Sequence, residues 1–185
     1  FSRMFDIKVE SGAGDGQHEF VWQNSWGFTT RSIGVAVLVH SDNQGLVLPP
    51  RVAGYQVVIV PVGITAKTSE EEKERILVAV KSIQQSLKGV RVHCDLRENY
   101  TPGWKFNDWE VKGVPVRIEV GPRDLANQQV RVAIRWNGEK LELPIDSLPT
   151  RIPQLLDTIH DGMLAKARLE RSTRTKTVGD FDEFT

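Results

Sequence analysis

The sequence predicts an α/β fold: a mixed five-stranded sheet flanked by helices, preceded by a short antiparallel α+β segment. The first observation is a continuous apolar run over 56–62, followed by a helical pattern and a second strand-like run. Such a unit places its two strands parallel. The second observation is the alternation of apolar and polar residues over 114–120, the two-residue period of a strand. The third is Asn137-Gly138 between two strand-like runs, which is a strong hairpin signal.

The composition is that of an ordinary globular protein. Of the 185 residues, 39% are hydrophobic and 26% are charged, with 24 Lys and Arg against 24 Asp and Glu. The zero formal net charge argues against non-specific nucleic-acid binding, but a local basic patch can still recognise a few bases. No apolar run approaches the roughly 20 residues of a membrane-spanning helix, and no signal peptide opens the sequence. We therefore expect a cytoplasmic protein without a membrane partner.

The N-terminal part predicts two strands and a helix. Residues 1–10 and 19–27 alternate like strands, and the glycine-rich segment 11–16 predicts a flexible hairpin tip between them. Thr29 or Thr30 can cap the helix that follows. The sequence begins inside an element, which predicts a piece cut from a longer protein. Strands separated from their sheet expose unpaired edges, so we expect the first 45 residues to be poorly ordered, domain-swapped or packed against another copy.

A second domain is predicted to begin at Tyr55. Its first strand, over 56–62, is apolar enough to be buried on both faces. Thr68 or Ser69, each three residues before a glutamate, can form a capping box at the start of a helix. That helix ends at Gly89, and a strand over 90–95 follows. The apolar face of the helix is made by Ile76, Val80, Ile83 and Leu87.

The segment after residue 100 predicts a short helix whose ends are specified locally. Thr101 can cap it, Pro102 suits its first turn and Gly113 suits its C-terminal exit. We expect two of its three aromatic residues to face the core; the three are Trp104, Phe106 and Trp109.

The C-terminal part predicts a hairpin and a long helix. Strands over 130–136 and 140–143 pair across the Asn-Gly turn, and the last helix follows Thr150. The apolar stripe of this helix is Ile152, Leu155, Leu156, Ile159, Met163 and Leu164. After Ala167 comes a basic run that favours a solvated helix face or tail, with RNA contact as the alternative. The run consists of Arg168, Arg171, Arg174 and Lys176.

Three segments resemble the prolyl-tRNA synthetases of the eukaryote and archaeon-like type. Residues 102–124 carry the run PGWKFN-WE-KGVP-R-E-GPRD. The GFTTR segment at 27–31 resembles the third signature motif of class II synthetases, and 41–53 resembles the link from the catalytic to the anticodon-binding domain. The resemblance implies three parts: the end of a class II catalytic domain over 1–53, an anticodon-binding domain over 54–167, and a linker towards a further C-terminal domain over 168–185.

The resemblance also implies an activity, namely ATP-dependent activation of proline and its transfer to tRNA(Pro). ATP and Mg would be the cofactors, and the full-length enzyme would be a homodimer. Thr29 and Arg31 match ATP-binding positions, and a guanidinium both pairs with phosphate and stacks on a base. From periodicity alone, a plain strand, turn and helix packed in a core is the favoured interpretation of this segment, and only the resemblance shifts it towards a nucleotide site. The first two signature motifs are missing, so no catalytic residue is expected and the isolated chain should be inactive.

The alternative is a non-catalytic synthetase-like module that binds RNA or protein. The GFTTR segment discriminates between the two, because a stand-alone module has no use for it. No residue spacing suggests a zinc site, and we expect no metal ligands. The single cysteine, Cys94, is expected to be a small buried hydrophobe.

Anticodon recognition requires side chains that bind the edges of splayed bases. Proline anticodons share two adjacent guanines, whose acceptor edge suits arginine and whose donors suit a carboxylate. Arg117 and Glu119 alternate with apolar residues and are expected on the open face of their strand; with Arg123 they are the first candidates. Arg131 and Arg135 on the neighbouring strand come next. From the residues alone, Arg117 and Glu119 are also compatible with a cross-strand ion pair.

Overall fold

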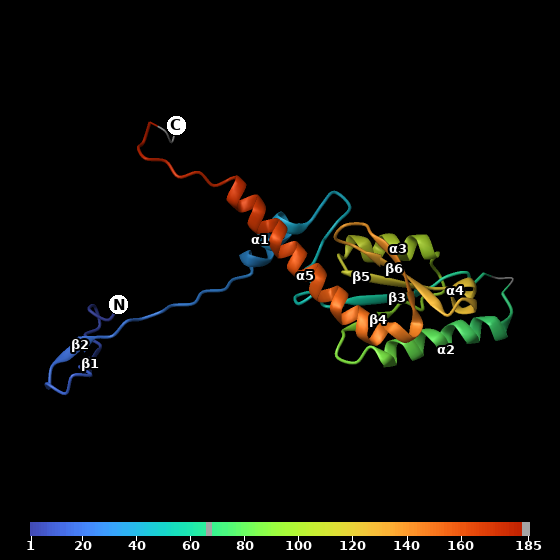
Figure 1. Ribbon diagram of the computed structural model, residues 1–185, viewed down its shortest axis with the longest axis horizontal. Coiled ribbons are helices and arrows are strands. Elements are labelled where there is room, and N and C mark those ends of the chain that lie inside the picture. The colour runs from blue at the N-terminus through green and yellow to red at the C-terminus, as the bar shows by residue number, and fades with distance from the viewer. Residues whose placement is uncertain (66–67, 183–185) are drawn as a thin grey trace. The chain divides into compact units, whose positions relative to one another are not determined.

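The computed structural model of the protein describes residues 1–65 and 68–182 (Figure 1). The chain divides into two compact units, Phe1–Gly34 and Val35–Thr185. The first unit contains a two-stranded hairpin, and the second contains a five-stranded sheet with its helices. The helix α1 (Arg31–His40) includes residues of both units.

The first unit holds a short antiparallel hairpin. β1 (Lys8–Glu10) pairs with β2 (His18–Phe20), and Gly14 and Gly16 in the turn adopt positive φ angles, so the predicted hairpin tip is confirmed. The predicted strand lengths are wrong, because only three residues of each run are paired and 21–29 has no regular structure. Alternation produces a strand only where another strand pairs with the backbone, and beyond these three pairs the two described runs of the hairpin are joined only by the Val21–Ile7 and Ser11–Gln17 backbone hydrogen bonds that flank them.

This hairpin is expected to exchange its amide hydrogens much faster than the central sheet. All six paired residues are exposed, and an isolated two-stranded hairpin is marginally stable in water. By contrast, β3 (Val57–Pro61) is buried at every position. In native-state hydrogen exchange on a dilute sample, β1 and β2 should show almost no protection, whereas β3 should exchange only on global unfolding. Equal protection of the first 45 residues and of β3 in a monomer would contradict this expectation.

The second unit is built on the predicted mixed five-stranded sheet. In spatial order its strands are β4 (Val92–Cys94), β3, β5 (Val116–Val120), β6 (Gln129–Ile134) and β7 (Lys140–Pro144). β3 is parallel to both β4 and β5, whereas the β5–β6 and β6–β7 pairs are antiparallel. Gly138 has a φ of +73° in the β6–β7 turn, so the hairpin signal is confirmed.

The helix α2 (Glu70–Ser86) connects β3 to β4 and begins as predicted. Ser69 Oγ accepts a hydrogen bond from the Glu72 amide at 3.2 Å, which satisfies one of the free donors of the first turn. Gly89 has a φ of +78° beyond the end of the helix, a conformation that suits glycine. The predicted apolar face is buried, and it consists of Ile76, Val80, Ile83 and the C-cap residue Leu87.

The helix α3 (Pro102–Val111) connects β4 to β5. Thr101 Oγ1 accepts a hydrogen bond from the Trp104 amide at 3.3 Å, so the predicted cap is confirmed. Trp109 and Phe106 pack in a hydrophobic cluster, whereas Trp104 is 44% exposed. Two of the three aromatic residues therefore face the core, as expected.

Two short helical segments precede the last helix: α4 (Pro122–Ala126) follows β5 and the 3-10 helix η1 (Ile145–Ser147) follows β7. The helix α5 (Leu148–Thr173) begins earlier than predicted, because Pro149 is compatible with a first helical turn. Its buried residues are Leu148, Ile152, Leu156, Ile159 and Met163.

The C-terminal half of α5 differs from the prediction in two respects. Leu164 was expected in the apolar stripe but is 42% exposed. The helix also continues to Thr173, so the predicted linker 168–185 begins inside it. Residues 183–185 of that linker lie outside the described residues.

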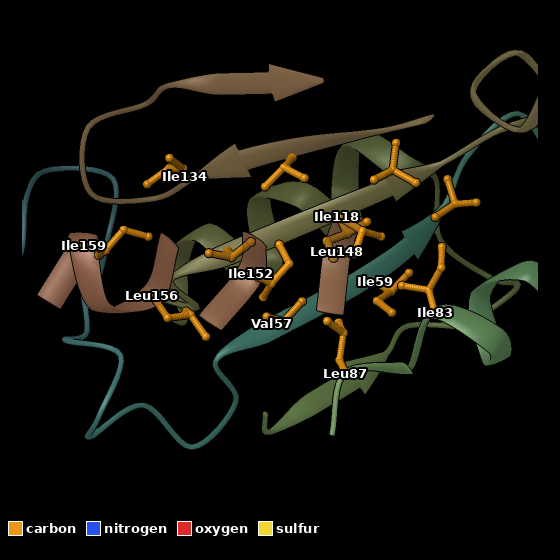
Figure 2. Close-up of a cluster of buried hydrophobic side chains, with 14 of the residues drawn as sticks. Val57, Ile59, Ile83, Leu87, Ile118, Ile134, Leu148, Ile152, Leu156 and Ile159 are labelled. Atoms are coloured by element: carbon orange, nitrogen blue, oxygen red, sulfur yellow. The ribbon is translucent and has the colours of Figure 1, made fainter. Parts of the chain in front are cut away.

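The sheet carries a hydrophobic core on each face. On one face, Val57 and Ile59 of β3 pack with buried side chains of α2 and α5 (Figure 2). On the other face, Val58 and Val60 pack with Trp109 of α3. Successive side chains of a strand point to opposite faces, so α2 and α5 cover one face and α3 covers the other. Figure 1 shows α2 and α3 on opposite sides of the sheet.

The segment 42–53 packs on the second unit through its backbone. The Leu46 amide donates to the Val111 carbonyl at 3.0 Å, and the Leu48 amide donates to the Gly113 carbonyl at 3.3 Å. Gly113 has a φ of +71°, as its predicted place after the helix requires. The segment 42–53 belongs to the same compact unit as the sheet, whereas the predicted boundary assigns it to the preceding domain. That boundary stays a prediction.

Candidate functional site

A crevice of about 410 Å³ opens at the carboxyl ends of β3 and β5. Ligands in α/β sheets commonly bind outside the carboxyl ends of parallel strands. The lining residues of this β3–β5 crevice are Val62, Gly63, Glu119, Gly121, Pro122, Arg123, Asp124 and Arg131. It therefore gathers three of the predicted anticodon contacts, Glu119, Arg123 and Arg131.

Two glycines shape the wall of the β3–β5 crevice. A Cβ on Gly121 would come within 2.9 Å of Val62 Cγ2, and one on Gly63 would come within 2.9 Å of Pro122 Cδ. Asp124 Oδ2 accepts a hydrogen bond from the Gly121 amide at 3.0 Å, which caps α4. The GPRD segment therefore forms a tight corner that holds the crevice open at the end of β5.

The charged residues of the crevice come from two adjacent strands and from α4. Glu119 of β5 lies directly opposite Arg131 of β6 in the antiparallel register. Arg131 is exposed and lies 3.5 Å from Glu142, a solvent-facing ion pair of little strength. Arg123 on α4 is exposed at the edge of the crevice. Both arginines are thus accessible to a ligand.

Arg117 fixes the position of the Glu119 carboxylate by a hydrogen bond. Its Nε donates to Glu119 Oε1 at 3.1 Å, and its Nη1 donates to Glu110 Oε1 at 2.8 Å. The Phe106 ring covers the guanidinium, with 4.0 Å between Cζ and the ring centroid. Within the described part of the chain no hydrogen bond engages Glu119 Oε2, so this oxygen is free to accept one from a ligand.

The predicted open face of β5 is wrong. Arg117 is 8% exposed and Glu119 is 9% exposed, because α3 lies over the face that they share. The alternative prediction, an ion pair between Arg117 and Glu119, agrees better with the structure, although both residues lie on the same strand and not on two neighbouring strands. Arg117 therefore positions Glu119, and only Glu119 lines the crevice.

Arg135 lies away from the β3–β5 crevice, contrary to the prediction. Its amide donates to the Pro115 carbonyl at the start of β5, whereas Arg131 lies opposite Glu119 near the end of that strand. The Arg135 Nη1 and Nη2 atoms donate to the two carboxylate oxygens of Asp42 at 2.8 and 2.6 Å. These bonds lower the pKa of Asp42 to about 2. Arg135 thus ties the segment 42–53 to the sheet.

The two predicted ATP-binding residues lie at the start of α1. Arg31 is its first residue and is exposed, and the Thr29 carbonyl accepts a hydrogen bond from the Ser32 amide at 3.0 Å. Their contact with ATP stays a prediction.

A buried carboxylate network, which the sequence did not reveal, lies beyond the end of β4. Asp95 is 1% exposed and accepts hydrogen bonds from Arg97 Nε at 2.9 Å, Arg97 Nη2 at 2.7 Å and Trp109 Nε1 at 2.8 Å. Burial by itself would raise the pKa of Asp95, but these hydrogen bonds hold it well below its usual range. The only sequence signal was the polar run 95–100 directly after a strand.

The same loop borders a second crevice, of about 320 Å³, at the carboxyl ends of β3 and β4. This β3–β4 crevice is lined by Lys73, Arg97, Lys105 and Tyr100 among others. None of these residues was a predicted site residue, because they come from two helices and a loop that are separated in the sequence.

Metal-ligand clusters and membrane-spanning helices are both absent from the described residues. No group of three or more His, Cys, Asp or Glu side chains is placed to hold a metal ion in this part of the chain. No helix within 1–65 and 68–182 has the length and apolar character needed to cross a membrane. Cys94 is half-buried against the core, and burial raises the pKa of its thiol.

Comparisons with known proteins converge on one kind of domain. The family described as "Anticodon binding domain" matches residues 56–155. The bifunctional glutamate/proline--tRNA ligase of Drosophila melanogaster is 49% identical over all of this chain, which covers 11% of that protein. The proline--tRNA ligase of Encephalitozoon cuniculi is 47% identical over all of this chain, which covers 37% of it.

A solved structure agrees in fold as well as in sequence. The prolyl-tRNA synthetase of Cryptosporidium parvum, complexed with L-proline and AMP, superposes with a TM-score of 0.82 at 46% identity. The match covers 98% of this chain and 38% of that one. The chain thus spans less than two fifths of the length of each of these three relatives.

Proposed function

Because this chain belongs to the anticodon-binding domain family, in the form that prolyl-tRNA synthetases carry, we propose that its β3–β5 crevice recognises the guanines of the proline anticodon. The observation that carries the proposal is the meeting of Glu119, Arg123 and Arg131 at the end of β5. One carboxylate and two guanidinium groups are the side chains that guanine recognition requires.

The chemistry follows from the hydrogen-bonding edges of guanine. Glu119 Oε2 accepts from the imino and amino donors of the base, while Arg117 keeps the carboxylate in place. Arg131 or Arg123 donates to O6 and N7, the usual arginine contact with guanine. The bases must be splayed out to present these edges, as they are in a single-stranded loop.

For the complete protein the proposal is a proline--tRNA ligase that activates proline with ATP and transfers it to tRNA(Pro). The names of the relatives over the whole chain, residues 1–53 included, support this over a non-catalytic module. Thr29 and Arg31 would bind ATP in that enzyme, which would act as a cytoplasmic homodimer. The described residues offer no fitting set of ligands for Mg, so no step is assigned to a metal on this chain.

The proposal is tested by binding this chain to a proline tRNA transcript and to the same transcript with both anticodon guanines replaced. We expect each replaced guanine to weaken binding by about 1–3 kcal/mol. The dependence of affinity on salt should barely change, because the phosphate contacts are the same in both RNAs. Equal affinity for the two transcripts at every salt concentration would overturn the proposal.

A pair of arginine variants localises the effect. Arg123→Ala removes a cation from the β3–β5 crevice, and Arg151→Ala removes an equally exposed cation from α5. The first variant should lose part of the preference for the guanine-containing transcript, and the second should keep all of it.

A further inference from the structure

The β3–β4 crevice lies beside the switch point of the sheet, which is between β3 and β5. β3 and β4 are parallel neighbours, and the helices that leave their carboxyl ends cover opposite faces of the sheet. α2 follows β3 on one face and α3 follows β4 on the other. α3 crosses over β3 to reach β5, and the crevice opens beyond the carboxyl ends of β3 and β4, the end of the strands at which α/β sheets bind ligands. The crevice at this place has about 320 Å³.

The lining of the β3–β4 crevice includes three cations, each of which has a carboxylate partner within 4.0 Å. It contains Lys73, Arg97 and Lys105 against one carboxylate, Glu98. Lys105 is 5% exposed, and its Nζ donates to the Asp95 carbonyl at 3.2 Å. An ammonium group has three donors, the nearest carboxylate oxygen of Asp95 lies 4.0 Å from Nζ, and burial lowers the pKa of Lys105. An anion in the crevice would supply the missing hydrogen bonds and charge.

An exposed pair of aromatic rings lies at the same place. Tyr100 lines the crevice and stacks on Trp104, with ring centroids 3.9 Å apart and ring planes inclined by 16°. The two residues are 43% and 44% exposed. The Arg97 guanidinium carbon lies 5.1 Å from both ring centroids. Stacked aromatic rings beside cations are the platform on which proteins hold the bases of single-stranded nucleic acids.

The two crevices share one wall. The chain that leaves β3 lines the β3–β5 crevice with Val62 and Gly63, and it lines the β3–β4 crevice with Pro61 and Ile64. A single RNA strand that places a base in one crevice therefore brings its neighbouring nucleotide to the other.

We propose that the β3–β4 crevice binds a nucleotide adjacent to the anticodon guanines, with its phosphate at Lys73 and Lys105 and its base stacked on Tyr100. This inference rests on the proposed function of the β3–β5 crevice, which supplies the rest of the RNA. The chemistry recognised is that of a nucleotide, phosphate and base together.

The test compares two variants of the crevice with two matched controls on the full chain. Lys73→Ala is matched by Lys81→Ala on the exposed surface of the same helix, α2. Tyr100→Leu is matched by Tyr55→Leu, because Tyr55 is 46% exposed and lies at the amino end of β3. Lys73 forms a surface ion pair with Glu98 at 2.8 Å, and such pairs contribute little to stability, whereas Tyr100 is 43% exposed, so both crevice variants should fold.

Binding to the proline tRNA transcript should weaken about tenfold for Tyr100→Leu, the loss expected for one stacked base. For Lys73→Ala the slope of log affinity against log salt should fall by about 0.7, the value for one phosphate contact of a single strand. Both variants should retain the preference of the wild-type chain for anticodon guanines. Wild-type affinity of both crevice variants, alongside an intact guanine preference, would overturn the inference and leave the proposed function standing.

A second arm identifies the source of the nucleotide. The wild-type chain is titrated with 5′-AMP and with inorganic phosphate, and intrinsic fluorescence of the five tryptophans, Trp104 among them, reports binding. Saturable AMP binding that Tyr100→Leu abolishes would support a crevice open to free nucleotides as well. A response confined to tRNA would support the RNA nucleotide alone. If neither AMP nor tRNA distinguishes the crevice variants from their controls, the site does not exist.

Discussion

Replacing Asp95 by asparagine is expected to lower the free energy of unfolding at neutral pH by about 3–5 kcal/mol, the cost of removing one partner from a buried ion pair. The Asp95 side chain is inaccessible to solvent and lies 2.7 Å from Arg97 Nη2 and 4.0 Å from Lys105 Nζ. Asparagine preserves the shape but not the charge. Lys105, only 5% exposed, would then lose the one carboxylate that the described residues place within 4.0 Å of it.

The hydrogen-bond geometry adds to this loss. The Asp95 carboxylate accepts bonds from Arg97 and Trp109 on both of its oxygens, whereas an asparagine side chain offers one acceptor oxygen and one amide donor. The amide donor would face another N–H donor in a buried place. Because α3 contacts the sheet through Trp109, the disturbance reaches the core between α3 and β3.

Urea unfolding at pH 7 measures the expected loss. The pKa of Asp95 is lowered in the folded state, so its stabilisation is present above the unfolded pKa of an aspartate and is lost only in strong acid. Neutral pH therefore shows the full effect. The matched control is Asp157→Asn, an exposed aspartate 3.7 Å from Arg51, which should change the stability by less than about 1 kcal/mol. A loss of similar size in both variants would show that the Asp95 network is not what stabilises this part of the fold.

The secondary structure could be predicted from the sequence because its signals are local. The side chains of Ser69 and Thr101 each accept a hydrogen bond from the backbone amide three residues further along the chain. Gly138 supplies a positive φ within a two-residue turn. The parallel pairing of β3 and β4 also follows from the sequence, since β3, α2 and β4 are consecutive. Signals of this kind need no knowledge of the rest of the chain.

The environment of the charged residues could not be predicted in the same way. Alternation showed that Arg117 and Glu119 lie on the face of β5 opposite to the apolar residues, but not that α3 covers this face. The partner of Arg135 is Asp42, 93 residues away in sequence. Polar residues on a covered face form ion pairs with one another. Which residues become partners depends on how α3 and the segment 42–53 pack on the sheet.

The residues of the candidate site fall into the same two groups: those that local sequence signals predict and those that only the packing of distant segments brings together. Glu119 and Arg123 could be predicted because the GPRD corner and its strand are contiguous in sequence, and Arg131 because it lies on the strand expected beside that of Glu119. The β3–β4 crevice was missed because Lys73 and Lys105 come from different helices. A site assembled from several elements has no sequence pattern of its own.

The second large effect concerns Gly113, which packs against the segment 42–53. A Cβ at this position would lie 2.7 Å from the carbonyl carbon, the carbonyl oxygen and Cβ of Leu46. The φ of +71° adds strain, because L-residues with a side chain rarely adopt it. Leu46 cannot move away freely, since its amide donates to Val111 and the Leu48 amide donates to Gly113 itself.

Gly113→Ala should therefore destabilise the protein by about 3 kcal/mol, the sum of roughly 1–2 kcal/mol of backbone strain and 1–2 kcal/mol of overpacking. Gly89→Ala isolates the first contribution, because Gly89 has a similar φ of +78° but no atom within 4 Å of the added Cβ. Urea unfolding should thus give a loss at Gly113 about twice that at Gly89. Equal losses would mean that the segment around Leu46 yields to the new methyl group, and that its hydrogen bonds to α3 contribute little to the stability of the second unit.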